Sequence, residues 1–134
     1  SYDRPAANML TRNNSQESEN LLLRCIALTA DTVDRYHIIL GDIYFENQRY
    51  EDAAREYLRS AELRKTHSSD SHFSLDVVFA KIAKALYYSG RYEQALDYAV
   101  QSSLLNPEDR EVAQLVYKIV MRQSALYKSQ TLNH

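Results

Sequence analysis

The chain has 134 residues, of which 45% are hydrophobic and 25% are charged, and its formal net charge is −2. A chain of this length can bury one domain-sized core. Its near-neutral charge and scattered basic residues exclude a nucleic-acid-binding stripe. No apolar run approaches the roughly 18 residues of a membrane span, so no membrane insertion is predicted. Only two glycines and two prolines are present, which is typical of an all-α fold.

The N-terminal residues 1–13 show little hydrophobic periodicity and are predicted to be a disordered tail. Because the chain does not begin with methionine, we expect it to be a piece of a longer protein. Asn14 and Glu17 have the spacing of a capping box, and the apolar run after them predicts a helix over 15–29. Cys25 in that run is the single cysteine. It cannot form an internal disulfide, so we expect an intracellular setting, cytoplasmic or nuclear.

Further amphipathic helices are predicted where apolar residues recur at spacings of three and four. They cover residues 31–47, 50–65, 75–88 and 92–105. The serine-rich stretch 66–74 divides the second of them from the third and is predicted to be a loop.

The sequence NPED at 106–109 predicts the start of a last helix. Asn106 can accept hydrogen bonds from the first amides, and Pro107 fits the first turn. The two acids that follow face the positive end of the helix dipole. We therefore expect a helix over 107–128 and a folded domain over 14–129.

Segment 34–67 is similar to segment 76–109 after a shift of 42 residues. Setting YEDAAREYLRSAEL over YEQALDYAVQSSLL pairs identical residues, namely Tyr50 with Tyr92, Glu51 with Glu93, Ala53 with Ala95, Ser60 with Ser102 and Leu63 with Leu105. Gly41 and Ala83 also coincide, and small residues there would let paired helices approach closely. Large residues such as Tyr44 and Tyr57 are expected to fill the space between the helices.

This pattern resembles the tetratricopeptide repeat, a two-helix motif of 34 residues. The first copy supplies its motif residues as His37, Leu40, Gly41, Tyr44, Tyr50, Ala53, Tyr57 and Ser60. The second supplies Phe79, Ile82, Ala83, Leu86, Gly90, Tyr92, Ala95, Ala99, Ser102 and Pro107. The first copy departs from the motif at Gln48, where glycine is usual, and at Lys65, where proline is usual. The resemblance implies a right-handed α-solenoid of antiparallel helix pairs, with two repeats and flanking helices.

The spacing of 42 residues resembles the lengthened repeats of kinesin light chain, although the glycine and the His-Pro pair of that loop are missing here. A leucine-rich helix, one repeat, a long loop and a second repeat also resemble the N-terminal region of the seventh subunit of the anaphase-promoting complex. Both assignments stay open from the sequence.

The resemblance also implies a binding groove, because the first helices of successive tetratricopeptide repeats line a concave surface. Carried over, its residues are Arg35, Ile38, Asp42, Phe45, Ala80, Lys84, Tyr87 and Lys118. One sub-family grips acidic chaperone tails with a lysine and an asparagine where this chain has Ile38 and Asp42. An isoleucine cannot pair with a carboxylate and an aspartate repels one, so that ligand is excluded.

No catalytic motif is present: the chain has no glycine-rich phosphate loop, no HExxH and no GxSxG. Its four histidines are dispersed, so neither a metal site nor a cofactor is predicted.

We therefore expect a non-catalytic scaffold that binds a protein or peptide in the groove. The alternative is a self-association module in a larger complex, such as a ubiquitin-ligase assembly, with a homodimer formed through the helix 15–29.

Overall fold

The computed structural model describes the backbone over residues 3–67 and 73–132, and the side chains from Asn14 onward within these ranges. Both ranges contain helices and no strand, which confirms the all-α prediction. The helices are α1 (Asp3–Leu28), α2 (Asp34–Glu46), α3 (Tyr50–Thr66), α4 (Leu75–Tyr88), α5 (Tyr92–Leu105) and α6 (Arg110–Leu132). The chain divides into a first unit, Ser1–Ser71, and a second unit, His72–His134.

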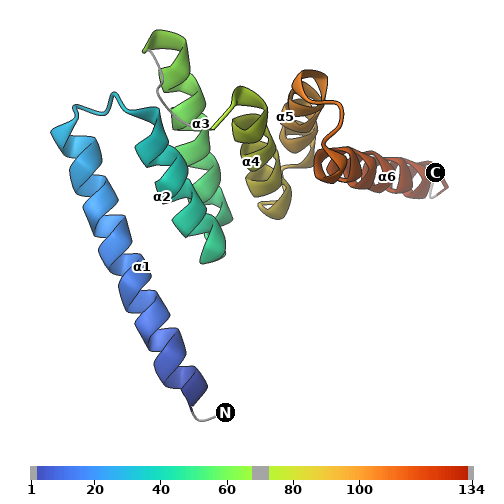
Figure 1. Cartoon of the computed structure of the whole chain (residues 1–134). Helices are drawn as coiled ribbons and strands as arrows, with labels where there is room; N and C mark the ends of the chain where they lie inside the picture. The colour runs from blue at the N-terminus through green and yellow to red at the C-terminus, as the bar shows by residue number, and fades with distance from the viewer. Residues whose placement is uncertain (1–2, 68–72, 133–134) are drawn as a thin grey trace. The chain divides into compact units, whose positions relative to one another are not determined.

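In the first unit, α2 and α3 form a helical hairpin (Figure 1). Leu40 of α2 and Ala53 and Tyr57 of α3 are buried at their contact. Gly41 lies directly against the Tyr57 ring, so the two helices approach as closely as the small residue allows. Tyr44 is also buried, and the predicted packing role of both tyrosines is confirmed.

The turn between α2 and α3 ends the first helix with a left-handed residue. Gln48 has φ of 63°, and the amide of Arg49 donates to the Tyr44 carbonyl over 2.8 Å. This pattern is a Schellman C-cap, a position that favours glycine because a side chain strains it. The departure from the repeat motif at Gln48 therefore leaves the turn intact and adds backbone strain.

Helix α1 packs on α2 and is anchored by a polar contact at Glu19. Its carboxylate accepts hydrogen bonds from the Tyr44 hydroxyl (2.9 Å) and from Arg49 (3.5 Å). The Arg49 guanidinium also covers the Tyr44 ring, with 4.2 Å from Cζ to the ring centroid. Burial and the Glu19 carboxylate together raise the pKa of Tyr44 to about 12, so the hydroxyl stays protonated as a donor.

The start of α1 corrects two predictions. The helix begins at Asp3, where the sequence predicted a disordered tail to residue 13, and it passes through Asn14, where a cap was expected. Pro5 falls in the first turn, where its missing amide costs no hydrogen bond. No glycine or proline follows before Leu28, so nothing in the sequence stops the helix from extending in the N-terminal direction.

The connection from α1 to α2 is held by a charged cluster around His37. Its Nδ1 donates to Glu56 over 2.7 Å, and its Nε2 bonds to Asp31. Arg59 completes the cluster with two hydrogen bonds to Asp31, of 2.9 and 3.1 Å. Burial lowers the pKa of His37, but the hydrogen bonds to the two carboxylates outweigh it and raise that pKa above its ordinary value. The two carboxylates thus favour the imidazolium form of His37, which can donate through both nitrogens.

In the second unit, α4 and α5 also form a hairpin. Ile82 and Ala83 of α4 and Ala95 of α5 are fully buried, and their counterparts in the first unit are buried too. The Ser102 hydroxyl, also buried, donates to the Asp76 carbonyl over 2.8 Å. Gly90 takes the left-handed turn position with φ of 82°.

Helix α6 packs on α5 through the buried side chains of Val112, Leu115 and Ile119. It begins at Arg110, three residues later than predicted, and reaches Leu132. The Asp109 carboxylate caps it by accepting from the amides of residues 111 and 112, at 3.1 and 3.2 Å. Asn106, the predicted cap, instead ends α5, because residues 106–109 form a turn before the new helix starts.

Within the described ranges, no helix is long and apolar enough to cross a membrane. The predicted loop 66–74 falls mostly on residues 68–72, which lie outside the described residues.

Candidate functional site

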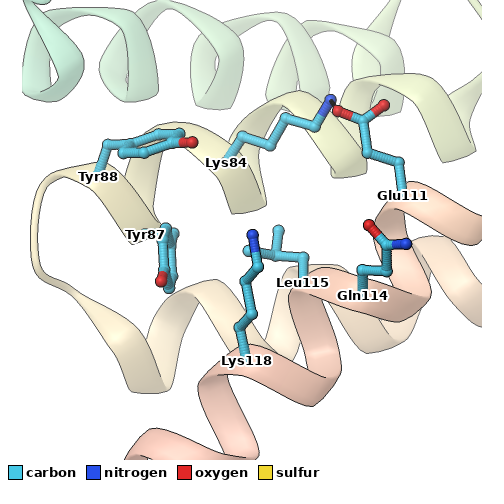
Figure 2. A pocket seen from close by; sticks show the side chains of 7 residues that line it. All are labelled: Lys84, Tyr87, Tyr88, Glu111, Gln114, Leu115 and Lys118. Carbon is cyan, nitrogen blue, oxygen red and sulfur yellow. Dashed lines mark hydrogen bonds and ion pairs between the residues drawn. The ribbon is translucent and has the colours of Figure 1, made fainter.

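A small hollow lies between α4 and α6 in the second unit (Figure 2). It encloses about 90 Å³ and is lined by Lys84, Tyr87, Tyr88, Glu111, Gln114, Leu115 and Lys118. Cofactor pockets usually measure a few hundred Å³ or more, so this hollow fits one side chain of a partner and not a cofactor.

Helical spacing explains why these side chains meet. The residues from α4 lie at positions i, i+3 and i+4, and those from α6 at i, i+3, i+4 and i+7, so each helix contributes one face. Leu115 is nearly buried and forms the apolar base between the helices. Its neighbours one turn away carry the polar groups at the rim.

The rim of the hollow carries more positive than negative charge. Lys84 forms an ion pair with Glu111 across the hollow, and the ends of the two side chains meet in Figure 2. The hydrogen bond and the charge of Lys84 hold the pKa of Glu111 below its ordinary value. Lys118 makes no ion pair with any residue in the part of the chain that the structure describes. Its ammonium is therefore available to an incoming carboxylate.

Tyr87 is held at the edge of the hollow by two aromatic neighbours. Its ring centroid lies 5.4 Å from those of Tyr88 and Tyr92, with interplanar angles of 80° and 72°. The Arg122 guanidinium covers the far side of Tyr92, with Cζ 4.3 Å from the ring centroid. These edge-to-face contacts fix the Tyr87 ring before any partner binds, which lowers the entropy cost of binding.

The predicted groove residues are divided between the two units. In the second unit, Lys84, Tyr87 and Lys118 come together at the hollow. Ala80, also on α4, does not line the hollow, and its side chain is buried. The predicted role of Ala80 as an exposed contact is therefore corrected to a packing role.

In the first unit, the predicted residues have partners of their own. Ile38 is fully buried, so it packs in the core and offers no surface to a peptide. Asp42 accepts a hydrogen bond from the Tyr57 hydroxyl. The Phe45 ring meets Tyr50 edge-on, with centroids 5.1 Å apart. Arg35, the fourth of them, lies over the Tyr36 ring, with Cζ 5.4 Å from its centroid. A groove shared by both units stays a prediction.

The carry-over of groove positions also gave Glu111, Gln114 and Met121 of the last helix, and the first two of these line the hollow. Two further lining residues, Tyr88 and Leu115, were missed by the sequence reading. Tyr88 lies four residues after Lys84, and Leu115 lies three before Lys118, so helical spacing could have found both.

No protein-family model matches the chain, and no match was found among the curated proteins. Among the residues that the structure describes, no three His, Cys, Asp or Glu side chains are grouped as metal ligands.

Proposed function

We propose that this chain is a non-catalytic interaction module of the tetratricopeptide type, and that the hollow between α4 and α6 receives a partner peptide or helix. The partner carries an aromatic or aliphatic side chain beside one or two acidic residues. The observation that carries the proposal is the unpaired ammonium of Lys118 next to the ordered Tyr87 ring and the apolar Leu115. Such a site offers one apolar anchor point and one charge of fixed sign.

The assignment to the tetratricopeptide type is supported by the burial of aligned positions. Gly41 and Ala83 are both buried in the first helix of their hairpins. Ser60 and Ser102 are both buried in the second helices. Burial of these pairs at a constant offset of 42 residues is what two copies of one packing unit produce. The pair at the end of the second helices differs, since Leu63 is buried and Leu105 is exposed.

The affinity of this site alone is expected to be modest. Exposed ion pairs contribute roughly 0.2–1 kcal/mol each, and the hollow accommodates only one anchor. Tight binding would need further contacts along the partner.

The experiment uses a labelled peptide with one tyrosine flanked by two glutamates on each side, and a matched peptide with glutamines in place of the glutamates. Fluorescence anisotropy should show the acidic peptide binding more tightly. Lys118→Glu should weaken its binding at least tenfold, while Lys118→Arg should preserve it. Lys65→Glu, an equal charge change on an exposed residue of α3, is the matched control and should have little effect.

Tyr87→Ala tests the anchor point separately from the charge and should weaken the binding of both peptides. Circular dichroism must show unchanged helix content for each variant. If Lys118→Glu and Tyr87→Ala both bind the acidic peptide as well as the parent chain does, the hollow is not the binding site.

Self-association through α1 is a second candidate function. It is favoured by the exposure of large apolar side chains on that helix, since Leu21 is 59% exposed and Leu28 is 83% exposed. The two lie seven residues apart and therefore on one face. Light scattering should then show a mass that rises with concentration, and the pair Leu21→Glu and Leu28→Glu should abolish the rise. A constant monomer mass for the parent chain would exclude this function.

A further inference from the structure

Helix α6 has a second apolar face, separate from the hollow and from its contact with α5. Ala113, Tyr117, Val120, Ser124 and Tyr127 follow one another at spacings of four, three, four and three residues. We call these five residues the outer stripe. At 100° per residue they gather on the side of α6 opposite the residues that line the hollow and pack on α5.

The outer stripe presents large apolar side chains to solvent. Tyr117 is 65% exposed, Val120 is 45% exposed and Tyr127 is 69% exposed. Single exposed apolar residues are common, but a row of them along one helix face marks an interaction surface.

The spacing of the outer stripe indicates that its occupant is a helix. Alternation of three and four residues gives a mean period of 3.5, which keeps a stripe facing a second helix that crosses at a shallow angle. A helix cannot pack on the outer stripe as closely as the paired helices of the two hairpins pack on each other. Tyr117 directly precedes Lys118, whereas Ala83 directly precedes Lys84, so α6 has a bulky ring at the position where α4 has a small residue. A helix on the outer stripe must therefore pack at a wider spacing.

The charge on α6 indicates which kind of helix fits. Two basic residues of the helix, Arg110 and Lys128, flank the outer stripe at about 60° from its centre. The other charged residues, Lys118, Arg122 and Glu111, lie on the opposite side of the helix. Glu111 is already paired with Lys84. A second copy of α6 would bring like charges together, whereas an acidic helix would be attracted. We propose that the outer stripe of α6 docks an acidic amphipathic helix of a partner protein, independently of the hollow.

The test uses two designed peptides of three heptads, both with leucine at positions a and d. One has glutamate at every e and g position, and the other has lysine there. Like charges at e and g keep each peptide from pairing with itself. Isothermal titration at physiological salt should show the acidic peptide binding, and the basic peptide binding at least tenfold more weakly. The acidic peptide should also lose affinity as salt is raised.

Variants in the chain then locate the site. Val120→Asp should weaken binding of the acidic peptide at least tenfold, and Val120→Leu should preserve it. Both substitutions are at an exposed position, so helix content should be unchanged. Tyr87→Ala, which alters the hollow, should leave this binding unaffected.

Three results would overturn the proposal. The first is equal binding of the acidic and basic peptides, or no binding of either at millimolar concentration. The second is unchanged binding by Val120→Asp. The third is a parent chain that sediments as a dimer and becomes monomeric with Val120→Asp, since the occupant would then be a second copy.

Discussion

Gly41 of α2 lies so close to Tyr57 of α3 that no side chain fits between them. A Cβ built on Gly41 would be 2.5 Å from Cε1 and 2.7 Å from Cδ1 of the Tyr57 ring. The ring cannot swing aside freely, because it is almost fully buried and its hydroxyl is bonded to Asp42. The small residue at position 41 therefore sets the distance between the two helices.

Gly41→Ala should lower the free energy of unfolding. Alanine favours a helix by about 1 kcal/mol over glycine, but overpacking a close contact costs about 1–3 kcal/mol, so a net loss is expected. Urea titration measures it. In the background of Tyr57→Leu, which removes the ring, Gly41→Ala should be neutral or stabilising. An equal effect of Gly41→Ala in both backgrounds would contradict the close contact.

The two hairpin turns give a pair of predictions of opposite sign. Gln48→Gly should stabilise the chain by about 0.5–1 kcal/mol, because it removes strain from a left-handed residue. Gly90→Gln should destabilise by a similar amount. A Cβ at Gly90 meets no atom within 4 Å, so backbone strain alone would act there. In thermal melts, the melting temperature should rise for Gln48→Gly and fall for Gly90→Gln. A shift in the same direction for both variants would refute the strain argument.

Asp109→Ala should cost about 1 kcal/mol, since it removes the cap of α6. Asn106→Ala is the comparison, because the sequence pattern alone marks Asn106 as the cap. It should cost less, since the Asn106 side-chain amide donates a long hydrogen bond, of 3.3 Å, to the Asp76 carboxylate and caps no amide of α6. Chemical denaturation of both variants compares their free energies of unfolding. A larger loss of stability for Asn106→Ala would show that Asn106 is the cap, as the sequence predicts.

The helices of both hairpins could be predicted from sequence because the apolar period, the turn residues and the repeat all agree there. The ends of the helices were harder to predict from sequence. At residues 106–109, Asn106 and Asp109 are both good caps, and only the turn that the chain makes in space selects Asp109. At the N-terminus, α1 extends to Asp3 without the hydrophobic period that a sequence reading looks for.

The candidate site could be predicted only in part, for a related reason. Lys84, Tyr87 and Lys118 were found because their register positions are at least partly exposed in this chain. Ile38 and Ala80 hold equivalent register positions, but in this chain both are buried. The position of a residue in the repeat motif predicts on which side of the helix its side chain lies, whereas its burial depends on the particular neighbours that cover that side chain.

Stability should depend on pH through His37. A histidine with a raised folded pKa contributes stability that is fully present below the unfolded value of 6.5 and is lost as the pH rises through the folded pKa. Asp31 determines how stability changes at acid pH. Burial raises its pKa, but hydrogen bonds from His37 and Arg59 outweigh burial and hold it below 3.8. The contribution of the cluster should therefore be greatest between about pH 4 and 6.5.

Urea midpoints measured from pH 6 to pH 9 check this expectation. The midpoint should fall across that range as neutral His37 leaves Asp31 and Glu56 without a shared cation. His37→Gln should be less stable at pH 6 and should show a flatter profile. A parent chain whose midpoint does not fall above pH 6.5 would show that His37 is not the charged centre of the cluster.

The last prediction concerns the two aligned serines. Ser60 and Ser102 are both buried, and Ser102 donates to the Asp76 carbonyl over 2.8 Å. The Ser60 hydroxyl has no hydrogen-bond partner in the part of the chain that the structure describes. A buried hydroxyl without a partner costs about 1–3 kcal/mol, and a satisfied one contributes about 1 kcal/mol. Ser60→Ala should therefore stabilise the chain, and Ser102→Ala should destabilise it.

Each variant is the control for the other, because both substitutions replace serine with alanine at the aligned position of a helix hairpin. The gain in helix propensity from serine to alanine is common to both and cancels in the comparison. The free energies of unfolding of the two variants should differ by about 1–2 kcal/mol, with Ser60→Ala the more stable. Equal shifts in urea titrations would mean that Ser60 has a hydrogen bond equivalent to that of Ser102.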